Sequence, residues 1–156
     1  MTDTVSVTKD IVADPPVVWD LISDLPRMGE WSPETTGGTW MGGATGPARG
    51  VRFSGRNRRG RHRWSTTATV AECDPHRCFA FEITYGNTKV ARWQYDIEPA
   101  TDGCRVTETW TDRRPAWFRH VGTVATGVRD RATHNRSTMS ATLDQLAEHA
   151  ESHSPT

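Results

Sequence analysis

The sequence predicts one α+β domain in which a curved antiparallel sheet of about seven strands wraps around a long C-terminal helix. Three observations support this fold class. The chain has 156 residues, enough for a single domain with its own core. Residues 35–112 contain short segments of alternating apolar and polar side chains separated by turns, which is typical of an antiparallel meander. The last part of the chain instead repeats apolar side chains every three or four positions, which indicates a helix.

The N-terminal region predicts one strand followed by two short helices. Residues 3–13 alternate and form the strand. Asp14, followed by Pro15, begins the first helix, because Asp is a preferred N-cap and Pro suits the first helical position. The apolar stripe of this helix consists of Val17, Val18, Leu21 and Ile22. A second short helix or turn spans residues 26–31.

The middle of the chain predicts six further strands joined mostly by hairpins. Their ranges are 35–42, 51–57, 61–73, 77–85, 90–98 and 104–112. The turns between them fall at the Gly- or Pro-containing stretches 43–50, 58–60, 74–77, 86–89 and 99–103. Alternation within the strands places one row of large side chains on the covered face of the sheet, and that row includes Phe53, Trp64, Phe79, Phe81, Trp93 and Trp110.

The C-terminal region predicts a helix with a break. One face carries Val121, Val124, Val128, Ala132, Asn135, Met139, Leu143 and Leu146. Gly122 and Gly127 each cost about 1 kcal/mol in a helix interior. We therefore expect a lead-in helix over residues 115–122 and a main helix over 127–150. The single domain is predicted to span residues 1–151, with a disordered tail at 152–156.

The composition narrows the range of functions. Acidic and basic residues balance at 19 each, so no overall charge attracts the chain to nucleic acid or to an anionic membrane. No apolar run is long enough for a transmembrane span, and the N-terminus lacks the apolar region of a signal peptide. We therefore expect a cytoplasmic location. The three cysteines fit a reducing compartment, where Cys73 and Cys78 are either free thiols or a disulfide across a hairpin.

One local pattern is a candidate binding site, and the usual metal and nucleotide motifs are absent. Residues 52–63 hold six arginines and His62, which favours a solvated hairpin, with a nucleic-acid or phospholipid patch as the alternative. The chain has no Cys-x-x-Cys pair, its six histidines are scattered, and it has neither a Gly-rich phosphate loop nor a Gly-x-Ser-x-Gly motif. The sequence therefore predicts no metal site, no nucleotide cofactor and no nucleic-acid partner.

Several short sequence segments together resemble those of a known protein family. They are Asp14-Pro15-Pro16 with Trp19, Gly-Glu-Trp-Ser-Pro-Glu at 29–34, Phe-Ser-Gly-Arg-Asn-Arg-Arg-Gly at 53–60, Phe-Ala-Phe-Glu at 79–82 and Val-Thr-Glu-Thr-Trp at 106–110. With the order of the elements, residues 3–150 resemble the helix-grip fold of the START-like superfamily, and in particular small actinobacterial proteins of the polyketide cyclase/dehydrase type. The resemblance implies a hydrophobic cavity between the sheet and the last helix. It is weak for function, because one fold hosts many activities.

Glu108 is the candidate catalytic residue. It shares the strand face of Val106 and Trp110, so it points inward if that face is covered. Burial would raise the pKa of its carboxyl group unless a cation pairs with it. Such a group serves as a general acid or base, or anchors a polar part of a ligand. The alternative is a structural ion pair with Arg56 or Arg113.

Two further positions have alternative interpretations. Asn135 interrupts the apolar stripe of the last helix, and its amide either faces the cavity or bonds to nearby backbone. Trp31 either forms a gate with Gly122 and Gly127 or fills the core. The complete predicted ligand-binding set is Trp31, Phe53, Trp64, Phe79, Phe81, Trp93, Glu108, Trp110, Val124, Val128, Asn135 and Met139.

Three functions follow from these expectations. The first is binding of a hydrophobic small molecule, such as a lipid, polyketide or isoprenoid-like compound, in the cavity. The second is a polyketide cyclase/aromatase-like enzyme that uses the same cavity and Glu108 without metal or nucleotide cofactor. The third is an interaction protein whose cavity is filled by its own side chains, and a homodimer is left open. A cavity below about 300 Å³, the lower range of ligand pockets, favours the third function.

Overall fold

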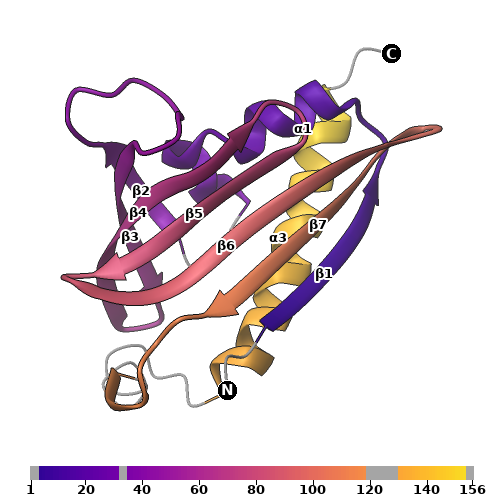
Figure 1. Ribbon diagram of the computed structural model, residues 1–156. Coiled ribbons are helices and arrows are strands. Elements are labelled where there is room, and N and C mark those ends of the chain that lie inside the picture. The colour runs from indigo at the N-terminus through magenta and orange to yellow at the C-terminus, as the bar shows by residue number, and fades with distance from the viewer. Residues whose placement is uncertain (1–3, 32–34, 119–129, 154–156) are drawn as a thin grey trace.

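The structure, a computed structural model, describes residues 4–31, 35–118 and 130–153 (Figure 1). Within these ranges the elements follow the predicted order. They are β1 (Thr4–Ile11), α1 (Pro15–Ile22), the 3₁₀ helix η1 (Leu25–Glu30), β2 (Thr35–Trp40), β3 (Arg52–Arg59), β4 (His62–Asp74), β5 (Cys78–Tyr85), β6 (Thr88–Ala100), β7 (Gly103–Asp112) and α3 (Arg131–His153). No described helix is long and apolar enough to cross a membrane.

The strands form one antiparallel sheet whose order is β1-β7-β6-β5-β4-β3-β2. Strands β2 to β7 follow one another along the sheet, and β1 pairs with β7 at one edge. Register shifts interrupt three of the pairings, between Thr35 and Gly37, Val70 and Glu72, and Ile83 and Thr84. Such bulges increase strand twist, and Figure 1 shows the sheet curving around α3.

The core lies between the concave face of the sheet and the helices, in two clusters. The larger cluster joins α1, η1 and the C-terminal half of α3 to the sheet, and there the Trp19 ring meets Phe79 edge-on at 5.8 Å between ring centres. The smaller cluster lies around Trp110 and Met139. Because α3 buries one face against both clusters, it sets the depth of the space that remains between them.

The main helix begins later and ends later than expected. It starts at Arg131 rather than at residue 127, directly after Asp130, whose carboxylate accepts hydrogen bonds from the Thr133 backbone N–H at 3.1 Å and hydroxyl at 2.7 Å. These bonds satisfy groups that a helix start leaves without partners. The helix continues to His153, two residues into the predicted tail. The lead-in helix is described only as far as residue 118, so the predicted break at Gly122 and Gly127 lies outside the described residues.

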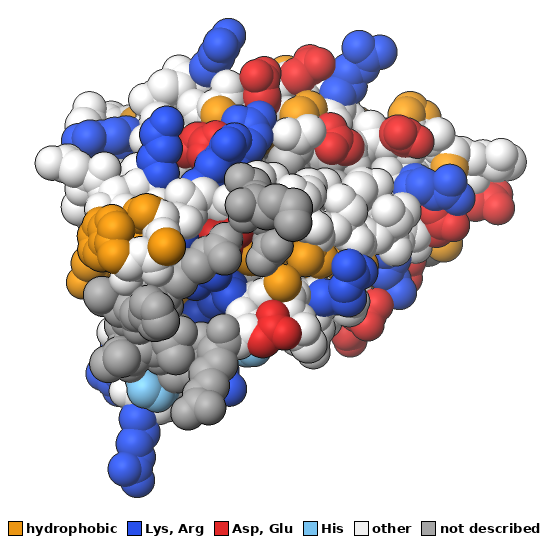
Figure 2. Space-filling model, turned by 60° about the horizontal axis from the view of Figure 1, so that its bottom comes forward, with side chains coloured by type: hydrophobic (Ala, Val, Ile, Leu, Met, Phe, Trp, Pro, Cys, Tyr) orange, Lys and Arg blue, Asp and Glu red, His pale blue; other side chains and the backbone are white. Residues whose placement is uncertain are grey.

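The arginine-rich hairpin of β3 and β4 closes with a two-residue turn. Strands β3 and β4 pair as far as Arg59 and His62, so the turn falls at residues 60–61, where Gly60 adopts a positive φ of 60°. Figure 2 shows basic and acidic side chains interspersed over the face it presents.

Cys73 lies opposite Phe79 rather than opposite Cys78, and all three cysteines are free thiols.

Candidate ligand-binding cavity

A cavity of about 110 Å³ lies between the concave face of the sheet and α3. Its apolar wall is built mainly by Leu25, Met28, Phe53, Phe81, Ile83 and Trp93. Its polar groups come from Asn57, Thr66, Tyr95, Glu108, Asn135 and Thr142. The lining draws on both core clusters, since Phe53 belongs to the larger one and Met139 to the smaller one. The cavity is therefore the gap where the curved sheet and the straight helix separate.

Glu108 is placed on the cavity wall by strand pairing. It lies on β7 between Val7 of β1 and Tyr95 of β6, and only 2% of its surface is exposed. The Tyr95 hydroxyl donates a hydrogen bond to Glu108 Oε2 at 2.5 Å. The other carboxyl oxygen, Oε1, is buried and has no hydrogen-bond partner within the described part of the chain. The carboxyl group therefore has one oxygen committed to the protein and one available to another group.

Burial controls the protonation of this pair. It raises the pKa of Glu108 to about 8, although the hydrogen bond from Tyr95 acts in the opposite direction. Burial, and then the neighbouring Glu108 charge, also raise the pKa of Tyr95 well above its usual value. At neutral pH Glu108 is therefore mostly a neutral carboxylic acid, able to donate a hydrogen bond or a proton.

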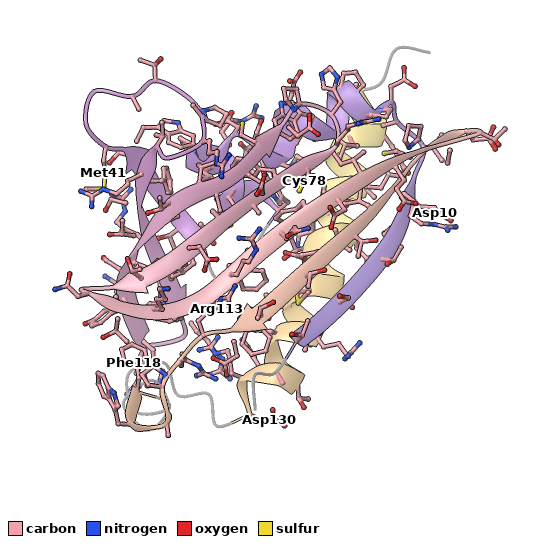
Figure 3. The ribbon with its side chains drawn as sticks, viewed as in Figure 1. Asp10, Met41, Cys78, Arg113, Phe118 and Asp130 are labelled. Carbon is pink, nitrogen blue, oxygen red and sulfur yellow. The ribbon has the colours of Figure 1, made fainter. Side chains whose placement is uncertain are left out.

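The predicted cationic partners of Glu108 are elsewhere, which corrects that expectation. Arg56 is exposed, because its position on β3 alternates with the inward-facing Phe53 row. Arg113 follows the end of β7 (Figure 3), and its guanidinium lies 3.5 Å from the Glu82 carboxylate. Glu82 in turn alternates with the buried Phe81 on β5, so this ion pair lies on the outer face of the sheet. The partner of Glu108 is instead the uncharged Tyr95 hydroxyl.

Helix α3 presents uncharged polar groups to the cavity. Asn135 is 3% exposed, and its side-chain amide makes no hydrogen bond to any described residue. The Thr142 hydroxyl donates to the Thr138 carbonyl oxygen at 2.8 Å, so it is already satisfied. Among the described lining residues there is no Lys, Arg or His. The wall is thus mostly apolar, with Glu108 and Asn135 as groups that have bonding capacity left.

The structure brings together half of the predicted ligand-binding residues. Those that line the cavity are Phe53, Phe81, Trp93, Glu108, Asn135 and Met139. Val124 and Val128 lie outside the described residues. The proposed gate partners of Trp31, Gly122 and Gly127, also lie there, so that gate stays a prediction.

Four predicted lining residues are placed outside the cavity lining. Trp31 is fully buried in the larger core cluster, where its ring meets that of His149 at 6.1 Å. Phe79 is enclosed between Trp19 and Phe81. Trp110 packs in the smaller core cluster, and Trp64 lies 6.0 Å from the Arg131 guanidinium at the start of α3. Inward orientation alone does not decide between core and cavity, because the helices cover most of the concave face.

Sequence reasoning missed Tyr95 as a site residue, although a signal was present. Tyr95 alternates in step with Trp93, so two-residue periodicity places it on the same strand face. The missing information was the register of the β6–β7 hairpin, which places Tyr95 directly opposite Glu108. The turn tightens to residues 101–102 instead of the expected 99–103, and the shorter turn determines this pairing. Leu25, Met28 and Ile83 were also missed as lining residues.

The described residues do not cluster in a way that suits a metal ion. No group of three or more His, Cys, Asp or Glu residues among them is arranged to hold one. His149 and His153 are four positions apart on α3, a spacing that can pair two ligands on one helix face. The His149 ring, however, contacts Trp31 and bonds the Gln145 carbonyl at 2.9 Å, and the His153 side chain lies outside the described part.

Solved structures show the same architecture. An NMR structure of a polyketide-cyclase-like protein from Corynebacterium glutamicum is 27% identical, with a TM-score of 0.61, and covers 96% of this chain and 90% of its own. The ginseng major latex-like protein 151 from Panax ginseng is 13% identical, with a TM-score of 0.73 and coverage of 96% and 97%. The di-domain ARO/CYC protein from the steffimycin biosynthetic pathway is 11% identical, with a TM-score of 0.75, covering 97% of this chain and 51% of its own.

At 11% and 13% identity, the last two likenesses establish the fold alone, and with the open curved sheet and long C-terminal helix they confirm the helix-grip, START-like architecture. No curated protein sequence matches the chain. The family model described as polyketide cyclase / dehydrase and lipid transport matches residues 2–151. Since that match spans nearly the whole sequence, the chain belongs to the polyketide cyclase/dehydrase and lipid transport family.

Proposed function

We propose that the protein binds a small, mostly apolar molecule in the cavity between the sheet and α3. The observation that carries the proposal is Glu108 Oε1, a buried oxygen without a hydrogen-bond partner in the wall of an apolar cavity. Leaving a buried polar group unbonded costs about 1–3 kcal/mol. A ligand with a hydrogen-bonding group would recover that free energy, while its apolar part contacts Phe53, Phe81 and Trp93.

The cavity volume limits the size of the ligand. At about 110 Å³ it is smaller than the pockets of about 300 Å³ or more that hold drug-sized ligands. An apolar cavity of about 150 Å³ nevertheless binds benzene. The conformation described therefore suits a molecule of about one ring, or one end of a longer molecule. Volume alone favours the interaction protein with a filled core, whereas the unbonded Glu108 oxygen favours a ligand.

Native mass spectrometry of the freshly purified full chain, with organic extraction of bound material, tests this proposal. Wild type is expected to carry a discrete added mass that disappears on denaturation. The Ala68→Leu variant would fill the cavity, because Ala68 lines it, and is expected to lose that mass. The matched control is Thr69→Leu, which adds bulk at the next position on the opposite face of β4 and should keep the mass. If each of the three proteins shows only its own ligand-free mass, the filled core is favoured.

A second candidate function is supported by the pKa of about 8 for Glu108. A carboxylic acid that keeps its proton near neutral pH can protonate a carbonyl oxygen of a bound poly-β-ketone, which assists carbon–carbon bond formation during cyclisation. The test supplies a linear poly-β-ketone that also cyclises spontaneously and compares the products by chromatography. Wild type should change the product ratio, and Glu108→Gln should restore the spontaneous ratio while it still binds. An unchanged ratio with wild type would leave binding as the function.

A further inference from the structure

We infer that the cavity selects an uncharged ligand whose carbonyl oxygen accepts a hydrogen bond from the Glu108 carboxyl group. This inference rests on the proposed function and names the chemical class of ligand for the same site. It differs from a general preference for apolar compounds, because it excludes fatty acids and other anions and ranks ketones above hydrocarbons of the same shape.

The first step is the orientation of the carboxyl group. Tyr95 is 3% exposed, and its hydroxyl donates to Glu108 Oε2. A protonated carboxyl group has one O–H donor, and its carbonyl oxygen is a stronger acceptor than its hydroxyl oxygen, so the Tyr95 hydrogen bond favours Oε2 as the carbonyl oxygen. The acid hydrogen therefore belongs on Oε1, the oxygen without a partner. The O–H group at Oε1 therefore suits a ligand that offers a hydrogen-bond acceptor.

The second step is charge. The described lining holds no Lys, Arg or His, so a carboxylate or phosphate group in the cavity would find no cation there. Burying an unpaired charge is far more costly than burying a hydrogen-bonded neutral group. The pKa of about 8 keeps Glu108 mostly protonated at neutral pH, which suits an uncharged acceptor. The amide of Asn135, which lines the cavity, offers an N–H as a second donor from α3.

Other titratable and charged groups on the surrounding elements do not replace Glu108 in this role. On β6 the contacting group is Tyr95, whose pKa lies well above its usual value. Further along β7 the Asp112 carboxylate is held by the Arg114 guanidinium at 2.9 Å. Lys9 on β1 pairs with Asp144 of α3 at 2.9 Å. On α3 the His134 ring, which does not line the cavity, lies 3.4 Å from the Thr138 hydroxyl.

Four one-ring probes of similar shape test the inference by isothermal titration calorimetry on the full chain. Acetophenone offers a carbonyl acceptor, cumene has no polar group, benzoate is an anion and α-methylbenzylamine is a cation. At about pH 6, where Glu108 is protonated, acetophenone is expected to bind about tenfold more tightly than cumene, the effect of one added hydrogen bond. Benzoate is expected to bind more weakly than cumene.

The pH dependence and two variants separate this hydrogen bond from general packing. At about pH 9.5, where the Glu108 carboxyl group is ionised, wild type should lose its preference for acetophenone over cumene. Glu108→Gln should keep the preference at both pH values, because its amide N–H donates and does not titrate. Glu108→Met should lose the preference at both pH values and still bind cumene, which shows that the cavity is intact.

Three results would overturn the inference while leaving the proposed function in place. The first is that wild type binds acetophenone and cumene equally. The second is that it binds α-methylbenzylamine most tightly, with an affinity that rises above about pH 8. The third is that it binds benzoate most tightly. The amine result would identify Glu108 as a buried anion that takes cations. If none of the four probes binds to wild type or to Glu108→Met, the proposed function fails, and this inference fails with it.

Discussion

The Glu108–Tyr95 pair places a carboxyl group where water cannot solvate it. Among the described residues its hydrogen-bond partner is the Tyr95 hydroxyl, and no cation pairs with it. The free energy of unfolding must therefore depend on its protonation, because burial favours the neutral form. This dependence can be measured without knowing the ligand.

We expect Glu108→Gln to stabilise the protein increasingly as pH rises. The pKa of Glu108 is about 8 in the folded protein and about 4.3 in an unfolded chain. Between these values the folded state binds more protons, so wild-type stability falls as pH rises. The amide does not titrate, so the advantage of the variant should grow through this window to a few kcal/mol, on the order of 1.4 kcal/mol for each unit of pKa difference.

Urea denaturation across this pH range measures the effect. The control is Glu72→Gln, which changes an exposed glutamate on β4 in the same way. A stability difference between wild type and Glu108→Gln that does not change with pH would contradict the burial argument.

We expect Tyr95→Phe to raise the pKa of Glu108 further. The Tyr95 hydrogen bond favours the ionised carboxylate, and the variant removes it without changing the shape of the ring. Carbon-13 NMR of labelled glutamate side chains would follow the titration directly. Tyr85→Phe, at an exposed tyrosine, is the matched control and should leave the pKa of Glu108 unchanged. A lower pKa in Tyr95→Phe would show that the hydrogen bond favours the protonated acid instead.

At the scale of elements, β2 lets the cavity wall pack closely because it has no side chain at Gly38. Gly38 lies opposite Gly55 of β3, and the Phe53 ring lies over Gly38. A Cβ atom built on Gly38 would lie 2.1 Å from the Ser54 carbonyl oxygen and 2.6 Å from the Phe53 ring. The close approach of this ring therefore requires glycine on β2.

We accordingly expect Gly38→Ala to lower the free energy of unfolding by about 1–3 kcal/mol, the usual cost of overpacking. The backbone oxygen of Ser54 cannot move aside as a flexible side chain can. Thermal unfolding followed by circular dichroism is a suitable measurement. Gly46→Ala is the control, because an added Cβ there meets nothing within 4 Å. Equal melting temperatures for the two variants would show that β2 and β3 separate easily.

At the scale of the whole molecule, the two core clusters and the cavity compete for the same concave surface. Residues that complete the core stabilise the fold, whereas Glu108 leaves a buried oxygen with no partner among the described residues and Asn135 places a polar amide in the cavity wall. Proteins commonly depart from optimal packing where they bind something. Stability and binding should therefore respond in opposite directions to substitutions in the cavity wall.

Asn135→Leu tests that trade-off. Replacing a buried amide that makes no hydrogen bond to any described residue by an apolar side chain of similar size should stabilise the protein by about 1 kcal/mol or more. The same change removes an N–H donor and should weaken the binding of acetophenone. Urea denaturation and calorimetry measure the two effects, and Arg136→Leu, at the next and exposed position, is the control. A destabilised Asn135→Leu protein would show that the amide has a structural role.

The sequence alone was sufficient to predict the described helices and strands and their order along the chain. Two-residue periodicity and turn residues predicted β2 to β7 within a few residues, because alternation reports which side chains a half-buried strand must hide. Three- to four-residue periodicity predicted the long helix, and Asp14 with Pro15 located the start of α1. Alternation also predicted that Glu108 shares the strand face of Val106 and Trp110, and all three side chains are buried. These are local properties, so a linear pattern can express them.

Only the tertiary structure decided which inward residues meet the cavity and what Glu108 contacts. Phe79 and Phe81 share one face of β5, yet Phe79 is enclosed in the core and Phe81 lines the cavity. The difference depends on where α1, η1 and α3 cross the sheet, and periodicity carries no information on that. The choice of Tyr95 over Arg56 or Arg113 depends on the β6–β7 register, and the cavity volume depends on the curvature of seven paired strands. Both are long-range properties, set by contacts between residues far apart in the chain.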